Sequence, residues 1–108
     1  MHPKLLKLEQ TFQRSSLTKI DDPFLQHHQI ELWIKRDDSL HPIISGNKWR
    51  KLKYSVNHAL EVGADTIMSM GGVYSNHLHA LAYLGKLLDL KTIGLIRGEP
   101  PTPLTPTL

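Results

Sequence analysis

Residues 65–98, DTIMSMGGVYSNHLHALAYLGKLLDLKTIGLIRG, contain the clearest pattern in the chain. Residues 66–70 and 92–96 are short apolar runs, which predict two buried strands. Gly71 and Gly72 are expected to break the first strand, and residues 76–88 form an amphipathic helix that Ser75 or Asn76 can cap. We therefore predict an α/β fold in which the two strands are parallel neighbours in an open sheet, joined by a right-handed crossover helix.

The sequence before this unit predicts a second helix over residues 48–64. Asn47 can cap its start and Gly63 can end it. Its apolar residues recur at helical spacing, and they are Trp49, Leu52, Val56, Ala59 and Leu60. Residues 30–38 alternate like a strand that ends in charged residues, whereas residues 1–29 lack periodicity and predict loops with short helical pieces.

These patterns divide the chain into four parts: residues 1–47, the helix of 48–64, the strand–helix–strand unit of 65–98, and the segment 99–108. The last segment holds four prolines in ten residues and cannot form a regular element. Two strands do not make a stable sheet alone. We therefore expect the chain to be incomplete: a fragment, or a truncated product of a longer gene.

Composition narrows the function classes. The 108 residues are 40% hydrophobic and 21% charged, as in a globular domain, and they include no cysteine, which excludes disulfides and thiolate metal sites. No apolar run could span a membrane or act as a signal peptide, so a cytoplasmic location is the default. The basic cluster at residues 48–53 lacks the features of a nucleic-acid reader. His77 and His79 are two residues apart on a helix and make poor co-ligands, so no metal site is expected.

Two stretches could carry chemistry. Lys48 follows Gly46-Asn47 at a predicted helix start, among other cations, where a lysine can act as a nucleophile through its neutral amine. The stretch GGVYSNH at residues 71–77 is strand, Gly-Gly and helix start, which is the geometry of an anion site. From the residues alone, an ordinary solvated lysine and a tight turn before a capped helix remain the alternatives.

The motifs together resemble one enzyme family. In order, they are IKRDD (34–38), GNKWRKL (46–52), GADT (63–66), GGVYSNH (71–77) and RGE (97–99). Residues 30–108 closely resemble the N-terminal third of the 1-aminocyclopropane-1-carboxylate deaminase / D-cysteine desulfhydrase family. The resemblance implies a tryptophan-synthase-β-like fold, with residues 1–47 in the larger domain and 65–98 beginning the smaller one. It also implies pyridoxal 5'-phosphate as cofactor, and a homodimer.

The resemblance assigns roles by position. Lys48 matches the family's Schiff-base lysine, and Asn47 matches an asparagine that helps to hold the cofactor. Ser75, Asn76 and His77 match the loop that binds the substrate carboxylate. Within that loop, Ser75 is also a candidate for proton transfer, and Asn76 for contact with the cofactor ring hydroxyl.

The chain also departs from the family. The family's phosphate loop, the residue facing the pyridine nitrogen and an active-site tyrosine lie further along. Tyr74 stands where deaminases favour glutamine, so SNH at residues 75–77 is nearer to the desulfhydrases. The implied function is that of a lyase or deaminase acting on a small amino acid. The alternative is a catalytically inactive α/β fragment without cofactor, and we expect no lyase activity from these 108 residues alone.

Overall fold

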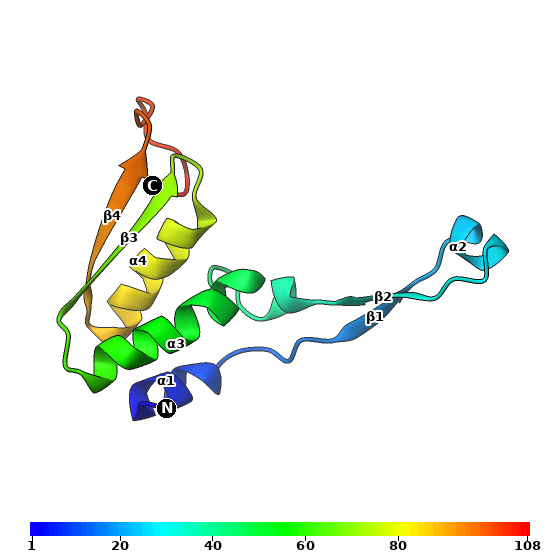
Figure 1. Ribbon diagram of the computed structural model, residues 1–108, viewed down its shortest axis with the longest axis horizontal. Coiled ribbons are helices and arrows are strands. Elements are labelled where there is room, and N and C mark those ends of the chain that lie inside the picture. Colours follow the sequence, from blue (N-terminus) through cyan, green and yellow to red (C-terminus); the bar gives the residue numbers. More distant parts are fainter.

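The computed structural model describes residues 1–108, and Figure 1 shows a packed body from which a thin arm projects. The elements in chain order are α1 (Pro3–Glu9), β1 (Leu17–Ile20), α2 (Pro23–His27), β2 (Leu32–Lys35), the 3-10 turn η1 (Asp37–Ser39), α3 (Asn47–Glu61), β3 (Thr66–Gly72), α4 (Asn76–Leu88) and β4 (Lys91–Arg97). The body consists of α1, α3, α4 and the β3–β4 pair, and the arm consists of β1, α2 and β2.

The strand–helix–strand prediction is confirmed. β3 and β4 pair in parallel, in a register that runs from Thr66 opposite Lys91 to Gly72 opposite Arg97. The predicted bounds of the helix, 76 and 88, are those of α4. The prediction that Gly71 and Gly72 break the strand is wrong, because both residues still pair with β4 and the chain turns only after them.

The core lies where α1, α3 and α4 meet. α3 and α4 run side by side, and α1 covers α3 (Figure 1). The nine buried residues of this core are Leu5, Ile44, Trp49, Leu52, Val56, Ala80, Leu81, Leu84 and Leu88. Phe12 packs edge-on against Trp49, with 4.7 Å between ring centroids. The apolar stripe predicted for residues 48–64 thus faces α4 and α1, as its helical spacing requires.

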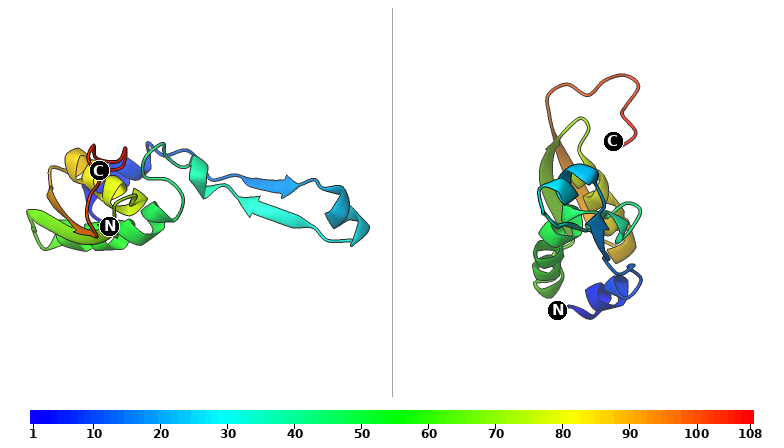
Figure 2. Two further views of the ribbon diagram at one scale, coloured as in Figure 1. Left: turned by 90° about the horizontal axis from the view of Figure 1, so that it is seen from above. Right: turned by 90° about the vertical axis from the view of Figure 1, so that its right-hand side faces the viewer.

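The arm was only half predicted. β2 lies within the strand expected at residues 30–38, but its partner β1 falls in the region expected to hold only loops and short helices. β1 and β2 pair antiparallel, from Leu17 opposite Lys35 to Ile20 opposite Leu32. The ribbon extends away from the body, as Figure 1 and the left view of Figure 2 show. Trp33 lies on this ribbon and is 48% exposed.

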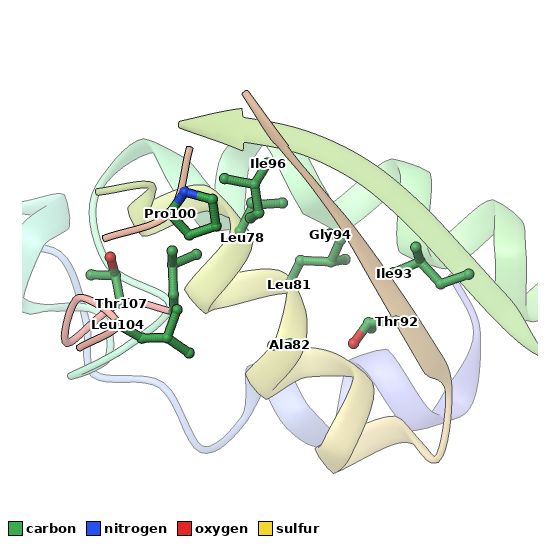
Figure 3. Close-up of a pocket in the computed structure, with 11 residues that line it drawn as sticks. Leu78, Leu81, Ala82, Thr92, Ile93, Gly94, Ile96, Pro100, Leu104 and Thr107 are labelled. Carbon is green, nitrogen blue, oxygen red and sulfur yellow. The ribbon is translucent and has the colours of Figure 1, made fainter. Parts of the chain in front are cut away.

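The segment of residues 99–108 folds back over α4 without forming a helix or strand. Thr105 is nearly buried, and its Oγ1 donates a hydrogen bond of 2.5 Å to the carbonyl of Val73. Figure 3 shows the apolar pocket, about 330 Å³, that the segment encloses against α4 and β4. Leu78 and Leu81 line it from α4, and Pro100 and Leu104 from the segment.

Candidate functional site

Lys48 lies in the first turn of α3, and a glycine sets the turn before it. Gly46 has φ +58° and ψ −135°, a conformation that side-chain-bearing residues rarely adopt. Gly46 occupies the N-cap position, and Asn47 is already the first helical residue. The prediction that Asn47 caps the helix is therefore wrong. Its side chain is used differently, since its Oδ1 accepts a hydrogen bond of 2.6 Å from the Lys48 Nζ.

Ser75 caps α4, and it is one of the two residues, Ser75 and Asn76, that the sequence predicted as the cap. Its Oγ accepts a hydrogen bond of 3.1 Å from the backbone N–H of Leu78. The backbone N–H groups of Asn76 and His77 donate to no acceptor within the chain. The start of α4 therefore offers two free donors at the positive end of the helix dipole, as an anion site requires.

Gly71 permits the close approach of β3 to this helix start. A Cβ at Gly71 would lie 2.7 Å from the Ser75 Cβ and 2.9 Å from the Leu78 Cγ, which are impossible distances. The glycine therefore sets how tightly the cap of α4 sits on the strand. The sequence predicted a different use for Gly-Gly, a close approach of the backbone to an anion, and both residues belong to the strand.

His77 is held by a partner that the sequence did not predict. Its Nε2 lies 2.8 Å from the Oγ of Ser69 on β3, at hydrogen-bond distance. Partial burial lowers the pKa of His77, and the positive charges of Lys48 and Lys51 lower it further. His77 is therefore neutral at pH 7. Ser69 and His77 are eight positions apart, on a strand and on the helix that follows it, so no local pattern in the sequence pairs them.

The two predicted regions lie at the same end of the body. Figure 1 shows α3 and α4 both beginning on the side of the body that faces the arm, with α4 following the end of β3. Lys48 and Lys51 are near enough to His77 for their charges to act on its imidazole. The structure records no hydrogen bond from Lys48 to Ser75, Asn76 or His77, and the Lys48 Nζ donates to Asn47 instead. The apolar pocket of Figure 3 contains none of these residues.

This arrangement can bring a small anion and a lysine amine together. The free N–H groups, Lys48 and Lys51 all favour negative charge there. No group of three or more histidine, aspartate or glutamate side chains is gathered as metal ligands would be. None of the helices has both the length and the apolar character needed to cross a membrane.

Comparison with known proteins gives a consistent answer. No family model matches the chain. A protein of Pyrococcus horikoshii named "Putative 1-aminocyclopropane-1-carboxylate deaminase" is 37% identical over 105 residues, which are 92% of this chain and 32% of that protein. The D-cysteine desulfhydrase of Salmonella newport is 41% identical over 68 residues, which are 63% of this chain and 21% of that protein.

The fold agrees with these relatives. A crystal structure described as an ACC deaminase homologue superposes with a TM-score of 0.71 at 33% identity, covering 92% of this chain and 32% of that one. The chain thus spans about a third of the length of the Pyrococcus horikoshii protein and of the ACC deaminase homologue. From its sequence and its fold, the chain belongs to the 1-aminocyclopropane-1-carboxylate deaminase / D-cysteine desulfhydrase family.

Proposed function

We propose that this chain is part of a pyridoxal-phosphate-dependent lyase or deaminase that acts on a small amino acid, with Lys48 as the covalent anchor of the cofactor. The observation that carries the proposal is the placement of Lys48 in the first turn of α3, on the side of the body where α4 begins with free N–H groups. The names of the relatives, ACC deaminase and D-cysteine desulfhydrase, agree with it.

The residues present fit part of such a cofactor. Lys48 supplies the amine, and Asn47 already accepts a hydrogen bond from it. Asn76 is exposed at the start of α4, where its amide can reach a ring hydroxyl. We assign no phosphate loop and no partner for the pyridine nitrogen within these residues. When bound, pyridoxal phosphate draws electrons away from the α-carbon of an amino acid.

The start of α4 would bind the substrate carboxylate. The N–H groups of Asn76 and His77 can each donate to a carboxylate oxygen. Ser75 Oγ accepts from Leu78, so its own proton is free to be donated to the substrate. The Ser75 hydroxyl is thus both a binding group and a candidate for moving a proton. His77 is neutral and bonded to Ser69, so its ring positions the loop.

The proposal extends to the substrate preference, the oligomeric state and the location of the protein. Tyr74 is 75% exposed immediately before the anion site, where it can restrict which side chain enters. Because Tyr74 stands at this position, we favour D-cysteine desulfhydration over cyclopropane ring opening. A homodimer and a cytoplasmic location are further parts of the proposal.

Chemical labelling tests the central assignment. The purified chain is incubated with pyridoxal phosphate, reduced with borohydride, digested and mapped. We expect the pyridoxyl group on Lys48, and none in a Lys48→Arg variant, whereas Lys51→Arg keeps the label. A label spread evenly over Lys48, Lys51 and Lys53 would refute the anchor.

The alternative function predicts a different result. An inactive α/β module without cofactor would show no preferred lysine, and no pyruvate or sulfide would form from D-cysteine. Specific labelling of Lys48 without turnover would instead indicate a cofactor-binding part that needs further residues for catalysis. The label and the assay together therefore separate the two proposals.

A further inference from the structure

Asp37 contacts the chain on both sides of Lys48. It belongs to the IKRDD motif and begins the 3-10 turn that leads from the arm into the body. Its carboxylate binds the residue two positions after Lys48, and its backbone carbonyl binds the residue two positions before it.

The carboxylate of Asp37 is held by two donors. Arg50 Nε lies 3.1 Å from Oδ2, and Arg50 Nη2 lies 3.3 Å from Oδ1, so the guanidinium binds both oxygens. Ser15 Oγ donates to Oδ1 at 2.5 Å. The hydrogen bonds from Arg50 and then Ser15 lower the pKa of Asp37, so the carboxylate is charged at neutral pH. A two-point contact of this kind fixes direction as well as distance.

The backbone of Asp37 holds the other side. Its carbonyl accepts a hydrogen bond of 2.8 Å from the N–H of Gly46, the residue with the positive φ. Nothing lies within 4 Å of where a Gly46 Cβ would be, so no side chain packs against Gly46 itself, and the nearest buried side chain before it along the chain is that of Ile44. The hydrogen bond to Asp37 is therefore a main restraint on the backbone that enters α3.

We propose that Asp37 is a positioning residue that fixes the first turn of α3 and thereby the direction of the Lys48 amine. This inference rests on the proposed function of Lys48. Asp37 touches neither Lys48 nor the anion site through any recorded hydrogen bond, so it acts through Gly46 and Arg50.

The neighbouring Asp38 provides a matched control. It has the same charge in the same motif, but it pairs with Arg36 within its own loop, at 2.8 Å and 2.7 Å. It makes no hydrogen bond to α3. Removal of Asp38 changes the charge of the motif and leaves the turn before Lys48 in place.

Two measurements test the inference. The first is hydrogen exchange in residues 46–50 compared with residues 56–61, in the variants Asp37→Ala, Arg50→Ala and Asp38→Ala. The second is the rate at which pyridoxal phosphate with borohydride labels Lys48, relative to Lys51 and Lys53 in the same sample. The conservative Asp37→Glu and the double variant Asp37→Ala/Arg50→Ala complete the set.

We expect Asp37→Ala and Arg50→Ala to speed exchange in residues 46–50 alone, and to slow Lys48 labelling about tenfold or more relative to the other lysines. The double variant should be no worse than either single one, because both remove the same pair. Asp37→Glu should keep most of the rate, and Asp38→Ala should match the unmodified chain. Arg50 is 55% exposed, so its removal gives a folded variant even if Asp37→Ala is unstable.

The outcomes are distinguishable. If Lys48 is labelled and Asp37→Ala behaves like Asp38→Ala, the positioning role is overturned. Equal slowing of all three lysines, or faster exchange throughout α3, would make Asp37 a general stabilising residue and overturn it too. If exchange changes as expected but Lys48 is never the labelled lysine, the proposed function fails while the restraint by Asp37 stands.

Discussion

The body and the arm are built from similar kinds of residue, yet they differ in what those residues bury. In the body, α3 and α4 together contribute seven of the nine buried residues of one core. In the arm, β1, α2 and β2 contain no buried residue, and Leu17, Phe24, Leu32, Trp33 and Ile34 are all more than 40% exposed. Figure 2 shows the reason, because the arm is a single layer and the body has several.

The two tryptophans make the difference concrete. Trp49 is 2% exposed and donates from Nε1 to Glu9 at 3.2 Å, whereas Trp33 is 48% exposed on the ribbon. An apolar side chain is buried only where a second layer covers it, and a two-stranded hairpin alone is marginal in water. The candidate site lies entirely in the body, and the arm reaches it only through the turn that contains Asp37.

The largest effect is expected from the core. Leu84→Ala removes a side chain that is 1% exposed, and it should lower the free energy of unfolding by about 2–5 kcal/mol. Leu32→Ala, at 46% exposure in the arm, should change it by less than about 0.5 kcal/mol. Urea unfolding followed by circular dichroism measures both. Equal losses would mean that the arm and the body unfold as one unit.

Gly46, at the start of α3, comes next. Gly46→Ala forces a side chain into φ +58° and ψ −135°, at a cost of about 1–3 kcal/mol. Gly72→Ala is the control, because its φ is not positive and a Cβ there meets nothing within 4 Å. The same urea titration should show a shifted midpoint for Gly46→Ala only. A neutral Gly46→Ala would show that the turn before Lys48 can relax.

The helix caps compare body and arm directly. Ser75→Ala removes the acceptor for Leu78 N–H and should cost about 1 kcal/mol of unfolding free energy. Asp22 caps α2 in the same way, accepting from Phe24 N–H at 2.8 Å. Asp22→Ala should fray α2 and leave the body's unfolding midpoint unchanged. Amide exchange resolves the two helices, and loss of body stability in Asp22→Ala would contradict the comparison.

The smallest expected effect is on the loss of stability at acidic pH. The hydrogen bond from Lys53, with that from Trp49, holds the pKa of Glu9 below its ordinary 4.5. The unfolded chain then binds more protons, so stability present above pH 4.5 is lost as the pH falls below it. Glu9→Gln should flatten this loss in unfolding curves between about pH 5 and 3.

Glu31 provides the corresponding pair in the arm. The hydrogen bond from Lys19 likewise lowers the pKa of Glu31, and the two atoms lie 2.8 Å apart. Glu31→Gln should leave the acid dependence of the body unchanged. An equal change in the acid dependence of both variants would mean that arm and body unfold as one cooperative unit.

Local pattern predicted the strand–helix–strand unit closely. The bounds of α4, the parallel pairing of β3 with β4 and the cap by Ser75 follow from residues that are near one another in sequence. The sequence also located Lys48 at a helix start and grouped Ser75, Asn76 and His77 in one turn. A helix face and a capping hydroxyl need only a few consecutive residues, so periodicity and side-chain chemistry determine them.

The remaining features depend on contacts that no local pattern encodes. β1 became a strand because β2 pairs with it, and Trp33 stayed exposed because no second layer covers the ribbon. Gly71 and Gly72 stayed in β3 because β4 supplies hydrogen-bonding partners.

The sequence alone therefore determined α3, β3, α4 and β4 of the body, and it marked the residues that we propose carry the chemistry. Only the tertiary structure decided how they meet: Ser69 with His77, Asp37 with Arg50, and the start of α3 on the same side as the start of α4. Ser69 and His77 are 8 positions apart in the sequence, and Asp37 and Arg50 are 13 positions apart. Their distance is set by the packing of whole helices and strands, which no short stretch of sequence specifies.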